Sequence, residues 1–280
     1  MEIRNSLKVV TLLFALALFS CGGGGEKPEE IIAEEEHTSP SFEESKFNAQ
    51  NVFNTLPERQ MVMDLIAEHK LEYNPDLLND PNSVGKYSVE FSKGINLGIY
   101  GADLCVSSSF DQTQESMVFL KCVNVLAQSL GVNSAFDQRM FERIDANNNN
   151  KDSVLEIVTD AFRKVDEILK YNNRPATSAI ILAGCWIEGL YISANMAETV
   201  QQEKIIKSIL AQKESLKNLI VMMESVKLEE GAKYILEGLK KLHESFVAAD
   251  SATKFDKAVI ADITKQVSEL RNKVVSVSIQ

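Results

Sequence analysis

Two apolar stretches decide the fold of this chain, GINLGIYGADLC at residues 94–105 and IILAGCWIEGLY at residues 180–191. Neither stretch alternates apolar with polar residues, as a half-buried β-strand does. Both are apolar on nearly every side, which is typical of helices at the centre of a bundle. The sequence therefore predicts an all-α, multi-helix bundle built around two buried helices.

Glycines at positions 94, 98 and 101 share one face of the first of these helices. Each glycine costs a helix up to about 1 kcal/mol relative to alanine, so three on one face need a reason. Either a neighbouring helix comes close at this face, or the face leaves room for a ligand between helices. For the second interpretation, the candidate ligand-binding residues are Gly94, Gly98, Gly101, Asp103, Trp186 and Glu188.

Asp103 and Glu188 are acidic residues within the apolar stretches. A buried carboxyl group needs a partner or a proton. The simpler interpretation pairs each acid with a helix terminus or with an arginine, and Arg139, Arg143 and Arg174 are available. The alternative is a hydrolase, in which two neighbouring carboxyl groups transfer protons.

Apolar residues at helical spacing continue on both sides of the two stretches. Gly131, Asn172–Asn173 and Gly231 fall near the ends of the periodic segments, as helix stop signals do. We expect no helix in the mature chain to be long and apolar enough to span a membrane. The expected helices cover residues 83–107, 111–130, 134–144, 152–171, 175–194, 197–226, 230–247 and 252–274.

A shorter segment nearer the N-terminus also has a helical pattern. Pro57 suits the first turn of a helix. Two Xaa-Pro pairs within residues 73–82 then predict a turn. The apolar side chains that share one face after Pro57 are Met61, Leu65, Ile66 and the stem of His69.

The two central stretches belong to a weak internal repeat. A shift of 86 residues aligns Gly98 with Gly184 and Leu104 with Leu190. Such a duplication predicts two related helical units that pack together, each led by an apolar helix. The two units are residues 83–172 and 173–278.

The N-terminal segment has Arg4 and Lys8, an apolar run over residues 9–19, and the tetrapeptide Leu18-Phe19-Ser20-Cys21. The run is too short to span a bilayer as a helix. This arrangement resembles the signal peptide and lipobox of bacterial lipoproteins. The resemblance implies that residues 1–20 are removed and that Cys21 is lipidated, whereas the alternative is an ordinary secretory signal.

Residues 21–45 continue as a tether, with four glycines at positions 22–25 and six glutamates within residues 26–36. Glycine-rich segments are flexible, and two or three acyl chains on one cysteine hold a protein stably at a membrane. The stretch is similar to the surface-export tethers of Bacteroidota lipoproteins. That resemblance implies an outer-membrane protein, facing the periplasm or the cell surface, whose helical domain is residues 46–280.

The 280 residues include 29 Lys and Arg against 40 Asp and Glu, a formal net charge of −11. This acidic balance argues against nucleic acid as a partner, because nucleic acid requires a basic surface. We recognise no pairing of a nucleophile with a base and therefore expect no catalytic activity and no cofactor. The sequence favours a non-enzymatic, lipid-anchored envelope protein that binds a protein partner or a small ligand.

The segment DANNNNKDSVLE at residues 145–156 partly resembles the calcium-binding loop of an EF-hand. Asn150 stands where the loop usually has glycine, and Asp152 where it has an aliphatic residue, so the affinity would be poor. The alternative is an Asn-rich connector before a helix whose N-cap is Asp152 or Ser153. The candidate ligands for calcium are Asp145, Asn147, Asn149, Lys151 through its carbonyl group, Ser153 and Glu156.

Cys105, Cys122 and Cys185 each lie in an apolar stretch without a histidine nearby. Free cysteines in such positions behave as small buried apolar residues, and a catalytic thiolate needs an electropositive neighbourhood. We expect structural cysteines, and spacing alone leaves open whether two of the three form a disulfide.

Overall fold

The computed structural model describes residues 72–147, 150–200, 203–250 and 257–276. All of these residues lie in the second of the two units into which the chain divides, residues 39–280. The described residues form α-helices and short 3-10 helices, and no strand occurs among them. The prediction of an all-α, multi-helix bundle is therefore confirmed.

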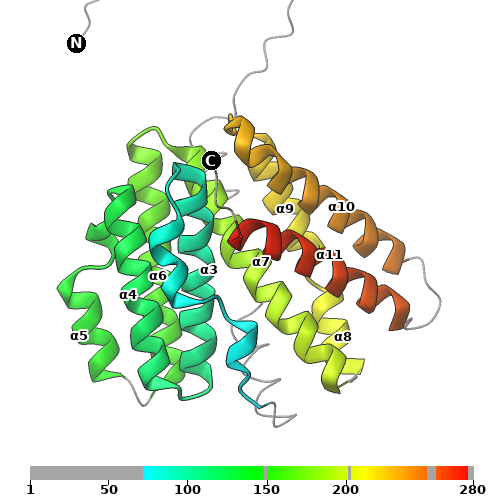
Figure 1. Cartoon of the computed structure of the whole chain (residues 1–280), viewed down its shortest axis with the longest axis horizontal. Coiled ribbons are helices and arrows are strands. Elements are labelled where there is room, and N and C mark those ends of the chain that lie inside the picture. The colour runs from blue at the N-terminus through cyan, green and yellow to red at the C-terminus, as the bar shows by residue number, and fades with distance from the viewer. Residues whose placement is uncertain (1–71, 148–149, 201–202, 251–256, 277–280) are drawn as a thin grey trace, which may run out of the picture. The chain divides into compact units, whose positions relative to one another are not determined.

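Figure 1 shows α3 to α6 on one side of the long helix α7, and α8 to α11 mainly on its other side. A single apolar core runs through the described helices, with Tyr100, Leu120, Trp186 and Phe246 among its fully buried side chains. The α-helices are α3 (Glu90–Ser109), α4 (Thr113–Leu130), α5 (Gln138–Ala146), α6 (Lys151–Tyr171), α7 (Pro175–Val200), α8 (Glu203–Leu210), α9 (Lys213–Glu224), α10 (Lys233–Asp250) and α11 (Lys257–Val275). The 3-10 helices are η1 (Pro75–Leu77), η2 (Pro81–Lys86), η3 (Asn133–Ala135) and η4 (Glu230–Ala232).

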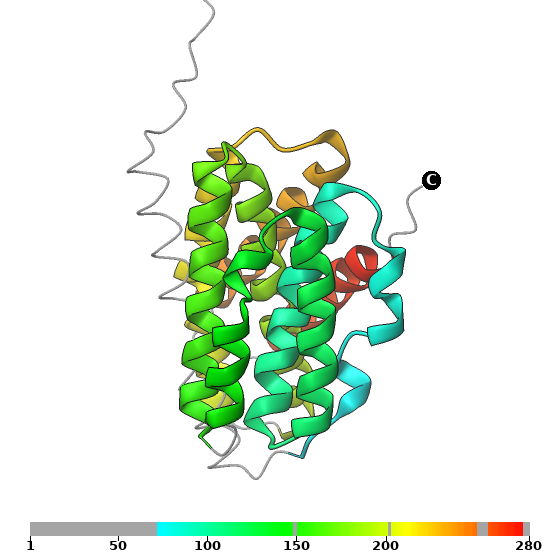
Figure 2. The ribbon, with the colours of Figure 1, turned by 90° about the vertical axis from the view of Figure 1, so that its left-hand side faces the viewer.

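The central pair of helices, α3 and α7, run in the same direction. Glu90 at the start of α3 accepts a hydrogen bond from Thr177 near the start of α7. Further along both helices, the carboxyl groups of Asp103 and Glu188 interact. Parallel neighbours need a crossover connection, and α4, α5 and α6 supply it (Figure 2).

The 86-residue offset reappears at the crossing of α3 and α7. A Cβ atom on Gly98 would come 2.0 Å from the carbonyl oxygen of Ile181, and one on Gly184 would come 2.0 Å from that of Ile95. Ile181 and Gly184 are the residues that the offset aligns with Ile95 and Gly98. The offset thus equals the register in which the two helices pack, while the duplication of a whole unit stays a prediction.

Several predicted helix ends are confirmed. Gly131 caps α4 in the left-handed conformation with φ of 73°, and Asn173, just after α6, has φ of 56°. Pro75 and Pro81 begin 3-10 helices capped by the side chains of Asn74 and Asp80, so the predicted turn lies where the Xaa-Pro pairs are.

Three predicted helix ranges are wrong. The helix expected over residues 134–144 begins at Gln138, because residues 133–135 form η3. The helix expected from residue 83 begins at Glu90, because residues 81–86 form η2, which the side chain of Asp80 caps. The helix expected over residues 197–226 is divided, since α7 continues to Val200 and α8 and α9 follow. The apolar periodicity continues across these breaks, so it carries no sign of them.

Over Pro175–Ala197, α7 is long and apolar enough to cross a membrane by length and composition, contrary to the expectation from sequence. However, 78% of its most apolar window is buried inside the structure. Contacts with α3, α6, α9 and α11 account for this burial. The apolar composition of α7 is thus explained by its central place in the bundle.

Candidate functional site

Asp103 from α3 and Glu188 from α7 lie side by side in the core, and neither side chain has any exposed surface. Their neighbour is Arg271, which belongs to the C-terminal helix α11. We call these three residues the Arg271 cluster. The parallel register of α3 and α7 brings the two acids to the same level, and the packing of α11 on both helices brings the arginine to them.

Arg271 binds Glu188 with two parallel hydrogen bonds. Its Nε donates to Oε2 over 3.0 Å and its Nη2 donates to Oε1 over 2.9 Å. Its guanidinium carbon also lies 4.8 Å from the centre of the Tyr191 ring. A planar guanidinium is suited to such bidentate pairing and to stacking on an aromatic ring. The predicted arginine partners are wrong for Glu188, because Arg174 pairs with Glu90 and Arg143 with Asp160.

Asp103 accepts fewer hydrogen bonds than Glu188. Its Oδ2 accepts from the backbone N–H of Asn79 over 3.2 Å, whereas its Oδ1 has no hydrogen-bond donor among the described residues. Burial and then the neighbouring Glu188 carboxylate raise the pKa of Asp103 well above its usual range. The raised pKa favours the protonated form of Asp103, and Arg271 balances the charge of Glu188.

The cluster also holds the segment before α3. Asn79 donates its backbone N–H to Asp103 and its side-chain amide to the Tyr87 hydroxyl. Tyr100 in α3 donates to the carbonyl oxygen of Asp80 over 2.8 Å. Residues 77–87, α3, α7 and α11 thus meet around one buried polar centre, which suits a role in positioning these four parts of the chain.

The sequence missed Arg271 and Asn79 as members of this centre. Arg271 directly follows Leu270 and lies three residues before Val274. It therefore borders the apolar stripe of the last helix, whose other members are Val259, Ile260, Ile263 and Val267. A basic residue bordering such a stripe was the available signal, because a buried arginine needs an acidic partner. Asn79 carried no comparable signal, since its hydrogen bond to Asp103 is donated by its backbone N–H.

Neighbouring helices pack against the glycine face of α3. Added Cβ atoms would meet the Ile180 side chain at Gly94, backbone atoms of α7 at Gly98, and the Phe162 ring of α6 at Gly101. Close helix packing therefore explains Gly98 and Gly101, whereas a Cβ at Gly94 would make only an ordinary van der Waals contact of 3.5 Å with Ile180. At all three positions, atoms of neighbouring helices occupy the predicted ligand slot. Trp186 is also fully buried, and its Nε1 has no hydrogen-bond acceptor among the described residues.

The residues of the calcium hypothesis lie at the α5–α6 connection. Asp145 belongs to the last turn of α5, while Lys151, Ser153 and Glu156 belong to the first turns of α6. Asn147 donates its side-chain amide to the carbonyl oxygen of Arg143, and Asn149 lies outside the described residues.

The N-cap of α6 is Asn150, whose Oδ1 accepts from the backbone N–H of Ser153 over 3.1 Å. The predicted caps, Asp152 and Ser153, are thus wrong by two or three positions. In the described parts of the chain, no three His, Cys, Asp or Glu side chains lie close enough to hold a metal ion.

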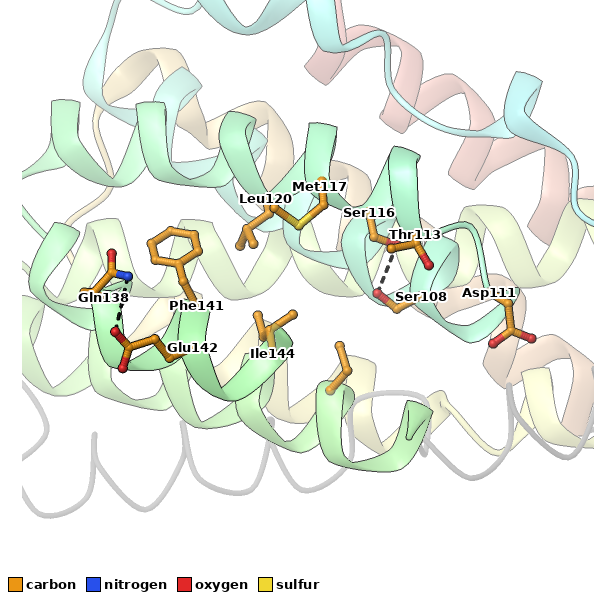
Figure 3. Close-up of a pocket in the computed structure, with 11 residues that line it drawn as sticks. Ser108, Asp111, Thr113, Ser116, Met117, Leu120, Gln138, Phe141, Glu142 and Ile144 are labelled. Atoms are coloured by element: carbon orange, nitrogen blue, oxygen red, sulfur yellow. Dashed lines mark hydrogen bonds between the residues drawn. The ribbon is translucent and has the colours of Figure 1, made fainter. Parts of the chain in front are cut away.

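A groove lies between α4 and α5 and is closed below by the start of α6, as Figure 3 shows. Its volume is about 400 Å³, within the range of small-molecule sites. We call it the α4–α5 groove. Its apolar lining consists of Met117, Leu120, Phe141, Ile144 and Val154.

Polar side chains line the two ends of the groove. Near the α3–α4 turn, Ser108 donates to Ser116 over 3.2 Å, beside Asp111 and Thr113. At the other end, Gln138 donates to Glu142 over 3.3 Å. Figure 3 shows Asp111 and Glu142 at opposite ends of the lining. An apolar middle with polar ends suits an elongated amphipathic ligand.

The apolar lining is partly open to solvent. Met117 is 44% exposed, whereas Leu120 beneath it is 1% exposed. Val118 and Val125 on α4 are also large, exposed apolar side chains. Exposed apolar surface beside a groove is a common feature of binding sites.

In the described part of the chain, Cys105, Cys122 and Cys185 form no disulfide. Burial raises the pKa of the Cys122 thiol to about 11, so it stays protonated at neutral pH. Burial also raises the pKa of the Cys185 thiol. Cys21, the predicted lipidation site, and residues 57–71 lie outside the described residues.

Comparison of the chain with protein-family models, with curated proteins and with solved structures finds no match.

Proposed function

We propose that this protein is a non-catalytic, lipid-anchored envelope protein that binds an amphipathic ligand in the α4–α5 groove. The observation that carries the proposal is the groove itself, with five apolar side chains along its middle and polar groups at both ends. Such a lining holds an apolar chain by burial and fixes its orientation through the ends. Because the polar ends include the acidic residues Asp111 and Glu142 and the described lining has no basic residue, an apolar chain with a cationic head group has this chemistry.

Support for the membrane anchor comes from the N-terminal sequence. The Leu18-Phe19-Ser20-Cys21 tetrapeptide follows a short apolar run and precedes four glycines. We place the protein at the outer membrane, where Cys21 carries the lipid and residues 22–45 form the tether. The membrane is then the first partner of the chain.

The two alternative functions have weaker support. A hydrolase that uses Asp103 and Glu188 needs its substrate to reach them, and both side chains are wholly buried. For the calcium hypothesis, helix α5 extends over Asp145 and α6 begins at Lys151, so the twelve-residue loop would have to unwind at both ends.

The groove is tested by the fluorescence of the apolar probe N-phenylnaphthylamine. The chain from Gly22 onward contains the whole second unit and serves as the protein. Met117→Glu places a charge in the apolar lining, and we expect it to weaken probe binding by about tenfold or more. Val221→Glu, at a similarly exposed position on α9, is the matched control. Equal affinity of the two variants would contradict the proposal.

The anchor is tested in cells by incorporation of labelled palmitate and by membrane fractionation. The wild-type chain should incorporate the label and sediment with outer membranes. Cys21→Ser should lose both properties, because the thiol that accepts the lipid is gone. Labelling of the Cys21→Ser variant would assign the lipid to another position and overturn the anchor.

A further inference from the structure

The α4–α5 groove has an acidic side chain at each of its two ends. Asp111, in the turn between α3 and α4, lines one end, and Glu142 of α5 lines the other (Figure 3). Glu115 in the first turn of α4 adds a further carboxyl group near the first end, where it accepts a hydrogen bond from Tyr73. A ligand that fills the length of the groove therefore meets a carboxyl group at both ends.

The basic residues of α4 and α5 lie outside the described lining of the groove. They are Lys121 on α4 and Arg139 and Arg143 on α5. Nη2 of Arg143 lies 3.9 Å from Oδ2 of Asp160 on α6, so this arginine has an acidic partner away from the groove. The charged side chains of the described lining itself are thus the two acids at its ends.

Each end of the groove also offers groups that suit an ammonium ion beside its carboxyl group. The hydroxyl groups of Ser108 and Thr113 line the first end, and the amide group of Gln138 lines the second. A primary ammonium has three donors, so it can bind a carboxyl group and a neighbouring oxygen at the same time. The aromatic ring of Phe141 adds a face that attracts a cation at the second end. Both ends can therefore receive a cationic group.

The apolar middle of the groove limits the length of such a ligand. The lining residues of α4, from Thr113 to Leu120, extend about 10 Å along the helix, and those of α5, from Gln138 to Ile144, extend about 9 Å. An extended aliphatic chain of about eight carbon atoms spans a similar distance, since each carbon advances it by somewhat less than a bond length of about 1.5 Å. A chain of this length reaches from one acidic end to the other.

We propose that the ligand of the α4–α5 groove is a linear aliphatic dication, with one ammonium group at Asp111, the other at Glu142, and its methylene chain against Met117 and Leu120. The inference rests on the proposed function, which it narrows from one cationic head group to a cationic group at each end. Recognition at both ends selects the length of the chain, which recognition of a single head group does not.

Equilibrium dialysis of labelled diaminooctane, with an amino group at each end, against the full chain in phosphatidylcholine vesicles tests the second charge. The competitors are aminooctanol and octanediol, which have the same length but carry one charge and none. We expect diaminooctane to bind about fivefold more tightly than aminooctanol, because the second ammonium gains a charge-assisted contact that is partly in solvent. The preference should shrink at high salt, which screens exposed charges.

Two variants locate the two charges. Asp111→Asn and Glu142→Gln each remove one carboxylate with little change of shape, and asparagine tolerates the left-handed conformation of residue 111, whose φ is 59°. Each variant should weaken diaminooctane binding by about fivefold, to the affinity that aminooctanol has for the wild-type chain. Glu214→Gln, an exposed acid on α9, is the matched control and should leave binding unchanged.

Equal affinity for diaminooctane and aminooctanol, or unchanged diaminooctane binding in either groove variant, would overturn the dication. The groove would then remain a site for a ligand with one cationic head group. The proposed function is tested separately by N-phenylnaphthylamine, which is uncharged and should bind Asp111→Asn and Glu142→Gln as it binds the wild-type chain. Equal binding of that probe to Met117→Glu and Val221→Glu would overturn the groove, and the dication with it.

Discussion

In the Arg271 cluster, polar groups are sealed within apolar surroundings, whereas in the α4–α5 groove apolar groups are left open to solvent. Glu188 and Asp103 have no exposed surface, and Arg271 is 8% exposed. Met117 in the groove is 44% exposed. A buried ion pair has to be satisfied by the protein itself, so the cluster fixes how distant segments meet. Exposed apolar surface is left for something else to cover, so the groove is the better candidate for binding.

The two regions also differ in how far apart in sequence their residues lie. In the cluster, Nη2 of Arg271 lies 3.5 Å from the carbonyl oxygen of Leu77. These two residues come from nearly opposite ends of the described chain. The groove is built by α3, α4, α5 and α6, which follow one another in sequence. Changes in the cluster should therefore affect the whole fold, and changes in the groove should affect binding alone.

The largest effect is expected from Arg271→Met. It leaves Glu188 buried without its partner, which typically costs about 3–5 kcal/mol of unfolding free energy. Urea unfolding of the variant measures this loss. Arg271→Met/Glu188→Leu should recover most of it, because two apolar residues can replace a buried ion pair at little cost. A double variant no more stable than the single one would contradict this account of the cluster.

A comparably large effect is expected from Gly98→Ala at the crossing of α3 and α7. The added Cβ would lie 2.0 Å from a carbonyl oxygen of α7, so the helices must move apart at a cost of about 3 kcal/mol. Gly85→Ala is the control, because its Cβ would meet no atom within 4 Å. Equal melting temperatures for the two variants would show that the crossing is not tight.

The third prediction concerns the pH dependence of stability. Because burial and Glu188 raise the pKa of Asp103, the folded chain keeps a proton that the unfolded chain loses above about pH 4. The stability linked to this proton is complete at lower pH and declines as the pH rises through the folded pKa. Asp103→Asn has no such proton, so its stability relative to wild type should increase as the pH rises from about 4 toward the raised pKa of the folded chain. A difference in unfolding free energy between Asp103→Asn and wild type that stays constant with pH, measured by urea unfolding, would assign the proton to another residue.

The smallest effect on stability is expected in the groove. Met117→Glu should change the unfolding free energy by no more than about 0.5 kcal/mol, because the side chain is already partly in solvent. The Val221→Glu control should have about the same melting temperature as Met117→Glu. A loss of several degrees only in Met117→Glu would mean that the groove is part of the core, and the contrast between the two regions would fail.

The apolar stretches at residues 94–105 and 180–191 were sufficient to predict an all-α bundle with two central helices. Apolar composition and glycine spacing are local properties, and both report burial directly. The ends of α4 and α6 were also predictable, because Gly131 and Asn173 adopt left-handed conformations that favour these residue types. The breaks on either side of α8 were not, since apolar periodicity runs through them.

The amino-acid sequence by itself determined the helical class, the central pair, the glycine face of α3 and the acids that need partners. Only the tertiary structure decided that Arg271, eighty-three residues from Glu188, is the partner, and that α4 and α5 leave a groove between them. The physical reason is that burial follows from local composition, whereas pairing and cavities depend on how helices distant in sequence pack against one another.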